Sequence, residues 1–503
     1  MQVLSGKLTG ALAAILSLAQ VAGAQPSIPG RATSATVAQV AGAQPSIPVR
    51  ETTAVEATSS AAFGNIFGVR ELANGRVLVN DGTHRQLVVV DAALANGRVV
   101  LDSTSDGTNS YGPKAAPLIP FPGDSSLFVD GGSGTLLVID RTGAISHVLS
   151  APKTSDLRYL AGGASAVDRN GNIVYRGANS PKASVPTTNG QPGRPPLILQ
   201  TADSAPIIRA NFETRLIDTV VRIKIQNGST LSMQQDANGK MTSKMIVNPT
   251  INVDEWAVLA DGTIAIVRGH DYHVDLIFPD RRSLSSPKLS FDWKPLTDAD
   301  KQHIIDSART AQLKVDADNK AAAVARGEKL SPDGNQMLAV KAGSMIANAT
   351  GLSGGKDGIG PPSRLAQVTA PELVFVPLSE MADYFPSIRP GAAKADLDGN
   401  LWVLPTTSAQ SKHGELVYDI INNKGELYQR MRMPDGRSVA GFGRNGVLYL
   451  MYKDGIAGWR LERTKIKGSL SPVGLRHAPT YRAFEVGEGC WVHGWSKGFH
   501  EET

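Results

Sequence analysis

Residues 268–275 (RGHDYHVD) hold the densest group of side chains able to do chemistry in this sequence. Two imidazoles, two carboxylates and a guanidinium follow one another closely along the chain. Because alternate residues of a strand share a face, we expect His273 and Asp275 to point the same way. A metal site needs three or four converging ligands with a supporting shell, and the sequence supplies no third ligand here. The pattern therefore indicates a polar hairpin, and it identifies neither a catalytic residue nor a metal ligand.

Two glycine-rich motifs match the sequence patterns of catalytic or cofactor-binding loops. Residues 441–446 (GFGRNG) match a dinucleotide fingerprint, whose chemistry needs a helix after the glycines, but the apolar run 447–450 predicts a strand there. Residues 351–355 (GLSGG) match a nucleophile elbow, which needs a strand before the serine and a helix after it. Neither context is present, so both motifs indicate ordinary turns or loops.

The elements that must carry any site come from a repeat between residues 75 and 140. Laid over each other without a gap, the two copies align Leu78 with Leu127, Asp81 with Asp130, Gly82 with Gly131 and Asp91 with Asp140. An aligned repeat of roughly 40–50 residues is typical of an array or a propeller. Each copy predicts short strands that are apolar on both faces, and radial stacking of four-stranded sheets buries such strands. A β-sandwich is the alternative, and the gapless repeat favours the propeller.

We therefore predict an all-β fold, a six-bladed β-propeller over residues 52–466. The segment 52–59 is expected to form an N-terminal strand that closes the ring by completing the last blade. Inside this domain, residues 178–205 are rich in Pro, Gly and Ser and predict a long loop, and residues 226–249 form a polar stretch.

A helical insertion at residues 296–369 separates blades four and five. Residues 297–300 (TDAD) form a capping box in which Asp300 replaces the usual Glu, and apolar residues then recur at helical spacing to about residue 326. The remainder of the insertion is Gly- and Ser-rich without a clear period.

The two ends of the chain lie outside the predicted propeller. Residues 1–24 resemble a secretory signal peptide, with Lys7 before an apolar run and a small-residue cleavage site, although a buried amphipathic helix is an alternative. Residues 25–51 contain a duplicated segment and predict a disordered linker. Residues 467–503 do not match the repeat and predict an irregular tail. We expect a secreted or periplasmic protein with no membrane span after signal cleavage.

Composition excludes some classes of function. The net charge is +5, but basic stripes interleaved with aromatic residues are absent, so we expect no nucleic-acid binding. Cys490 is the single cysteine, so an intramolecular disulfide cannot form.

Several segments carry a resemblance to a known family. They are residues 67–72 (FGVREL), 291–293 (FDW), 384–386 (YFP), 389–391 (RPG), 398–402 (DGNLW) and 439–443 (VAGFG). With these segments the chain resembles the secreted bacterial six-bladed β-propellers of the TolB-like and NHL-repeat type. The resemblance implies a fold and leaves function open, because propellers host many unrelated activities.

In a propeller of this strand order, the turn after each second strand and the link between blades lie on the same face, which we call the top face. We expect the long segments 104–113, 178–205, 226–249 and 296–369 to emerge there, with the helix as a partial lid. The candidate ligand-binding residues at this face are Asp81, His84, Asp130, Arg176, Arg268 and His270. The alternative for Asp81 and Asp130 is that they only cap turns.

These observations predict a binding or scaffold module that contacts a peptide, protein or glycan through its top face and is a monomer. The first alternative is a metal-dependent lactonase or lyase on the same fold. No cofactor is predicted, and bound Ca²⁺ in the central channel would favour that alternative. The second alternative is a purely structural surface protein.

Overall fold

The structure is a computed structural model. It describes residues 47–103, 110–112, 117–130, 135–162, 165–178, 182–184, 197–200, 202–225, 229–235, 241–325, 372–409, 415–455 and 457–468. The predicted signal peptide and nearly all of the predicted tail lie outside these ranges, as do residues 351–355.

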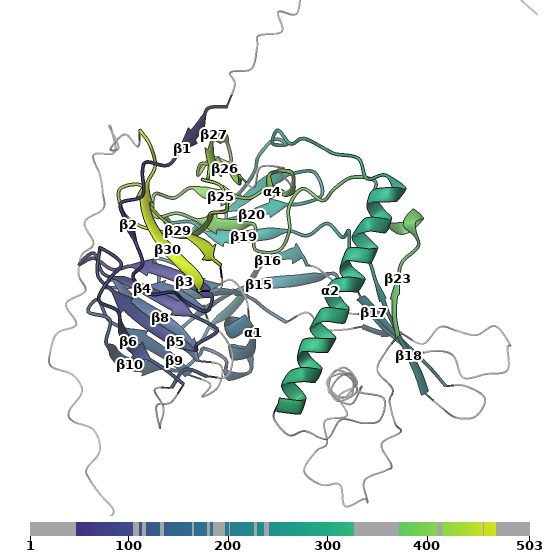
Figure 1. Ribbon diagram of the computed structural model, residues 1–503, viewed down its shortest axis with the longest axis horizontal. Helices are drawn as coiled ribbons and strands as arrows, with labels where there is room; N and C mark the ends of the chain where they lie inside the picture. Colours follow the sequence, from purple (N-terminus) through teal and green to yellow (C-terminus); the bar gives the residue numbers. More distant parts are fainter. Residues whose placement is uncertain are drawn as a thin grey trace, which may run out of the picture. The chain divides into compact units, whose positions relative to one another are not determined.

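Within the described ranges, six four-stranded groups follow one another in chain order (Figure 1). The first contains β3 (Ile66–Glu71), β4 (Val77–Asp81), β5 (Gln86–Val90) and β6 (Arg98–Leu101). The second contains β7 (Leu118–Phe121), β8 (Ser125–Asp130), β9 (Thr135–Ile139) and β10 (Ile145–Leu149). The third contains β11 (Ser165–Val167), β12 (Asn172–Arg176), β15 (Ser204–Asn211) and β16 (Ile217–Lys224).

The fourth group contains β19 (Glu255–Val258), β20 (Ile264–Arg268), β21 (His273–Ile277) and β22 (Ser283–Ser285). The fifth contains β24 (Ala393–Ala395), β25 (Leu401–Val403), β26 (Val417–Ile421) and β27 (Leu427–Arg432). The last contains β28 (Ser438–Phe442), β29 (Val447–Asp454), β30 (Gly458–Lys465) and β2 (Ala57–Thr58).

The first strands of these groups lie beside one another. β28 contacts β3, β3 contacts β7, β7 contacts β11, β11 contacts β19, and β19 contacts β24. Neighbouring antiparallel sheets that meet through their first strands form a propeller-like fold, so the prediction of an all-β, propeller-like protein is confirmed.

The N-terminal segment joins the last group, at the place where the sequence predicts a closing strand. β2 pairs antiparallel with β30, and the N–H groups of Glu56 and Ser59 donate to the carbonyls of Arg463 and Leu461 over 2.8 and 2.7 Å. The prediction of a disordered linker over residues 25–51 is wrong at its C-terminal end, where residues 49–51 form a strand. β1 (Val49–Glu51) pairs in parallel with β27, because the outer edge of that strand offers unpaired backbone groups.

A further five-stranded sheet, the extra sheet, was not predicted. Its order is β13 (Lys182–Ser184), β14 (Leu197–Gln200), β17 (Ser229–Gln235), β18 (Met241–Val247) and β23 (Glu372–Phe375). The predictions of a long loop at 178–205 and a polar stretch at 226–249 were therefore incomplete, because both contain strands. These strands come from three separate connections, each of which leaves the top face.

The helices also lie in top-face connections. They are η1 (Thr154–Asp156) with α1 (Leu157–Gly162), α2 (Asp298–Ala325), η2 (Leu378–Glu380) and α4 (Thr406–Ala409). The N-terminus of α2 is capped reciprocally by Thr297 and Asp300: the Thr297 hydroxyl donates to the Asp300 carboxylate over 2.7 Å and accepts from the Asp300 N–H over 3.2 Å. No helix in the described ranges is both long and apolar enough to cross a membrane.

The opposite face carries short turns closed by side-chain oxygens. Asp140, Asp168, Asp396 and Asn422 each accept hydrogen bonds from the N–H groups two and four residues later, over 2.8 to 3.0 Å. Such turns leave few polar groups free for a ligand. The two faces therefore differ, and the long connections gather on the top face.

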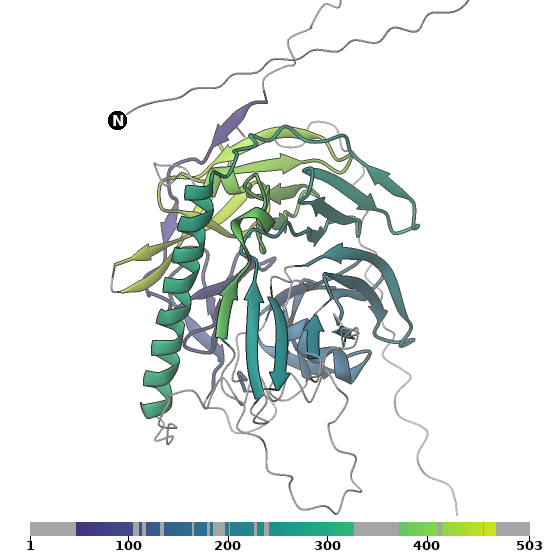
Figure 2. The same ribbon diagram turned by 90° about the vertical axis from the view of Figure 1, so that its right-hand side faces the viewer.

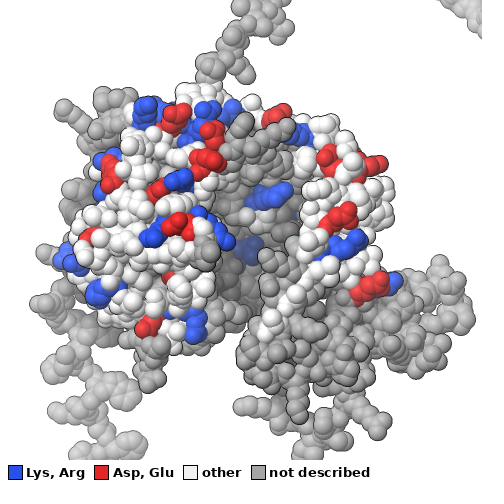
Figure 3. All heavy atoms as spheres, in the orientation of Figure 1, with Lys and Arg blue, Asp and Glu red and all other residues white. Residues whose placement is uncertain are grey.

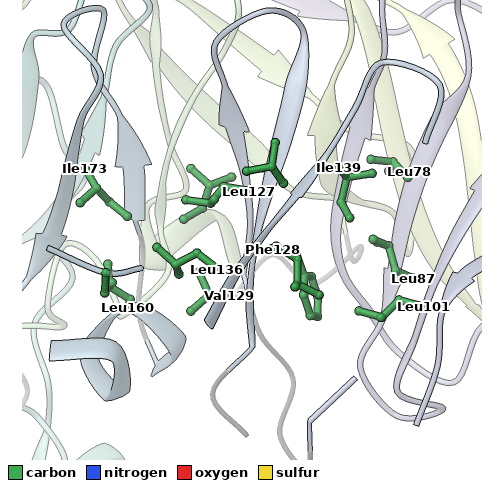
Figure 4. Packing of buried hydrophobic residues seen from close by; sticks show 14 of the residues in the cluster. Leu78, Leu87, Leu101, Leu127, Phe128, Val129, Leu136, Ile139, Leu160 and Ile173 are labelled. Carbon is green, nitrogen blue, oxygen red and sulfur yellow. The ribbon is translucent and has the colours of Figure 1, made fainter. Parts of the chain in front are cut away.

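The core is formed where the sheets pack face to face. Figure 4 shows one such contact, in which Leu78 and Leu87 of the first group approach Ile139 and Phe128 of the second. Leu78, Leu127 and Ile139 are fully buried. Burying one such side chain contributes about 1.5–3 kcal/mol to stability. These contacts therefore fix the positions of the strands that carry the top-face residues.

Candidate binding site on the top face

The second strands of the sheets end at the top face, and a hydrogen-bonded polar site lies at the end of β20. Arg268 donates from Nη1 to Asp254 Oδ2 and from Nε to Asp275 Oδ2, each over 2.7 Å. Burial acts to lower the pKa of Arg268, but the two carboxylates outweigh it and the pKa is raised. Arg268 is therefore a fixed cation that links the entry of β19 to β21.

Glu255 follows Asp254 and begins β19. Burial raises the pKa of its carboxyl to about 7, against the opposing effects of the Gly391 N–H and of Arg176, while Asp254 raises it further. A carboxyl that titrates near neutral pH in a polar site is a marker of functional positions. Glu255 can therefore change its charge at physiological pH.

Close backbone packing fixes this site. The Gly269 N–H donates to Asp254 Oδ1 over 3.3 Å, and the Ser387 hydroxyl donates to the Gly269 carbonyl over 2.7 Å. A Cβ atom at residue 269 would lie 2.0 Å from the Val253 carbonyl oxygen. Only glycine fits at residue 269. The close contact between these backbones places the segment before β24 against Glu255, and the Gly391 N–H of that segment bonds to the Glu255 carboxyl.

A second unusual charge lies on the neighbouring inner strand. Lys394 is the central residue of β24, opposite Trp402 of β25. Burial alone lowers the pKa of its ammonium group. Among the described residues, the ammonium has no hydrogen-bond or ion-pair partner. A partly buried cation without a carboxylate is costly unless a ligand or water compensates it.

The surface of the molecule has a hollow on one side. Figure 3 shows a hollow between the sheets on the left and α2 on the right, and Lys and Arg atoms are visible inside it. Basic groups within a recess raise the local concentration of anions and attract them.

Two of the six predicted residues act on neighbouring residues of this site. Arg268 binds Asp254, and Arg176, at the end of β12, acts electrostatically on the adjacent Glu255. The others do not join this group by any described contact. His270 lies exposed in the turn after β20.

Asp81 and His84 form a local pair at the end of β4. The Asp81 carboxylate accepts hydrogen bonds from the N–H groups of Gly64 and His84 and lies 2.7 Å from the His84 ring nitrogen Nδ1. Burial opposes the charge, but these hydrogen bonds outweigh it and the pKa of Asp81 is lowered. Asp81 thus caps a turn, and Asp130, at the end of β8, is also buried.

The polar hairpin at 268–275 is observed. His273 lies between two carboxylates, with Nδ1 at 2.6 Å from Asp271 Oδ1 and Nε2 at 3.3 Å from Asp275 Oδ1. Among the described residues, no group of three or more His, Cys, Asp and Glu side chains is arranged to hold a metal ion.

Sequence reasoning missed Asp254, Glu255, Gly391 and Lys394. A weak signal existed for two of them, because Glu255 stands at the start of a short apolar run and Lys394 lies within another. Nothing local indicated that these residues would meet Arg176 and Arg268.

No protein-family model matches the sequence, and no curated protein matches it. Among solved structures, the chain is similar to virginiamycin B lyase from Staphylococcus aureus (8% identity, TM-score 0.31, covering 80% of this chain and 95% of that one). It is similar to a gluconolactonase from Xanthomonas campestris (11% identity, TM-score 0.30, 81% and 88%). It is also similar to the PQQ-bound aldose sugar dehydrogenase from Streptomyces coelicolor (11% identity, TM-score 0.34, 82% and 97%). Likenesses of this low identity and TM-score carry no inference about activity.

Proposed function

We propose that this protein is a secreted or periplasmic six-bladed β-propeller that binds an acidic ligand, carried by a peptide, protein or glycan, at its top face. Six consecutive four-stranded groups and an N-terminal strand in the last group support the closed ring. The signal-like N-terminus supports export, and N-terminal sequencing of the mature protein from cell fractions tests it.

The observation that carries the proposal is the position of the Lys394 side chain on the inner strand β24. Its ammonium has no carboxylate partner among the described residues, although burial disfavours its charge. Arg176, exposed at the end of β12, adds a second cation. It interacts electrostatically with Glu255, which carries no charge when it is protonated. A carboxylate ligand would supply the negative charge that these groups lack.

The metal-dependent alternative receives no support from the same residues. A calcium site needs six to eight oxygen ligands, and two carboxylates of this site, Asp254 and Asp275, already bind the guanidinium of Arg268. The cationic groups of the site instead match an anionic partner.

Binding of charge-matched probes tests the proposal. Fluorescein-labelled hexaglutamate and oligogalacturonate are compared with hexaglutamine and a neutral oligosaccharide by fluorescence anisotropy. We expect the acidic probes alone to bind, and Lys394→Gln to weaken that binding at least tenfold, which corresponds to about 1.4 kcal/mol.

The matched control is Lys424→Gln, an exposed lysine in a turn on the opposite face. It is expected to leave affinity unchanged. Equal binding of acidic and neutral probes, or equal loss in the two lysine variants, would overturn the proposal.

A further inference from the structure

A groove runs between α2 and β23, away from the Glu255 site. It is lined by Gln302, Ile305 and Arg309 of α2 and by residues 372–378, and its volume is about 400 Å³. Figure 2 shows α2 alongside β23, with the rest of the extra sheet beyond it. Helix and strand therefore form two walls of an open channel.

The strand wall is a free sheet edge. β23 is the last strand in the order of the extra sheet, and it pairs in parallel with β18. The Val376 N–H donates to the Val247 carbonyl over 3.0 Å, which sets the alternation along the strand. Because backbone groups of successive residues point to opposite edges, those of Val374 point to β18, and those of Leu373 and Phe375 point to the groove.

These groove-facing backbone groups are available for pairing. Among the described residues, the N–H and C=O groups of Leu373 and Phe375 have no hydrogen-bond partner. An unpaired strand edge is a template for another strand, and β23 is short and is followed by Pro377, which limits uncontrolled pairing.

The helix wall is held at a fixed place. Lys301 Nζ donates to the Leu378 carbonyl over 3.3 Å and lies 3.1 Å from Asp383 Oδ1, and the side chain of Ile305 is buried. One turn later the Arg309 guanidinium lies 5.7 Å from the centre of the Phe375 ring. The anchored first turns of α2 keep the groove from closing onto the strand.

The groove carries one charged side chain of each sign. They are Arg309 on the helix wall and Glu372 at the start of β23, and Glu372 lies 3.7 Å from Lys244 of β18. Arg309 contacts Asp306 over 3.4 Å, but both side chains are more than half exposed, and such a pair is worth little. The guanidinium can therefore exchange that contact for another carboxylate.

We propose that this groove binds an extended acidic segment of a partner protein, which adds to the extra sheet beyond β23. The main chain of the segment pairs with Leu373 and Phe375, and an Asp or Glu side chain, or a terminal carboxylate, meets Arg309. Edge-strand addition of this kind takes affinity from main-chain hydrogen bonds and specificity from side-chain contacts.

The test uses the full chain and an array of octapeptides in which β-branched residues alternate with Asp, Glu, Asn or Gln. We expect binding to peptides that contain an acidic residue. Leu373→Pro removes the groove-facing N–H and spares the pairing with β18, so it should abolish binding. Leu373→Ala keeps that N–H and should retain binding within about threefold. Arg309→Gln should remove the preference for acidic peptides.

Methylated peptides supply an independent readout that does not depend on variant folding. Two versions of a bound peptide are compared, one N-methylated at its odd positions and one at its even positions. Only one of these two sets of N–H groups faces β23, so one version should lose binding and the other should keep it. No binding to any octapeptide, or equal binding by Leu373→Pro and Leu373→Ala, would refute the proposal. Dimerisation of the protein that Leu373→Pro abolishes would assign the groove to a second copy of this chain and also overturn it.

Discussion

Replacing Glu255 by Gln should stabilise the protein at neutral and alkaline pH. The pKa of the carboxyl is raised from 4.5 to about 7, chiefly by burial. The folded protein therefore holds this proton more tightly than the unfolded chain. Stability then falls as pH rises from about 4.5 to about 7 and levels off above, because the ionised carboxylate is disfavoured only in the folded state.

The size of the effect follows from the same values. Each pKa unit corresponds to about 1.36 kcal/mol, so complete ionisation of Glu255 costs at most about 3 kcal/mol. Gln keeps the size of the side chain and cannot ionise. We expect the variant to equal the wild type near pH 4 and to exceed it by up to about 3 kcal/mol at pH 8.

Urea unfolding followed by tryptophan fluorescence at pH 4, 5, 6, 7 and 8 measures this difference. The control is Glu213→Gln, at an exposed glutamate in the turn after β15. Its difference from wild type should stay constant across the series. If the curves of Glu255→Gln and wild type run parallel from pH 4 to pH 8, Glu255 is not buried in the way the structure shows.

Four further changes probe the scaffold. Leu127→Ala removes a fully buried side chain on the face of the second group that packs toward Ile173 (Figure 4), and it should cost about 2–5 kcal/mol in urea unfolding, so a cost below 1 kcal/mol would contradict the packing of the second and third groups. Gly269→Ala places a Cβ against the Val253 carbonyl and should cost about 1–3 kcal/mol and weaken binding of acidic probes. Asp81→Asn should lose about 1–3 kcal/mol at pH 7 and nothing at low pH, because a carboxyl with a lowered pKa stabilises only when ionised. Deleting residues 47–58 removes β1 and β2 and should lower the melting temperature and cause aggregation through the exposed edge of β30, and an unchanged melt would refute closure by this segment.

The sequence alone determined those elements whose information is local. The Val- and Leu-rich runs between Gly and Asp turns correspond to β4, β5, β8 and β9, because apolar runs and turn residues act over a few positions. The Thr297–Asp300 capping box marked the start of α2 in the same way. The hairpin over residues 268–275 and its shared face for His273 and Asp275 also followed from strand alternation.

The tertiary structure alone decided which distant segments meet. The extra sheet joins strands from Lys182 to Phe375 that have modest strand character by themselves, and each becomes regular only through its neighbours. Likewise, Glu255 acquires its raised pKa from burial at the start of β19, and Arg176 and Gly391 reach it from other sheets. Burial and electrostatic contact between distant residues depend on packing, and no spacing along the chain encodes them directly.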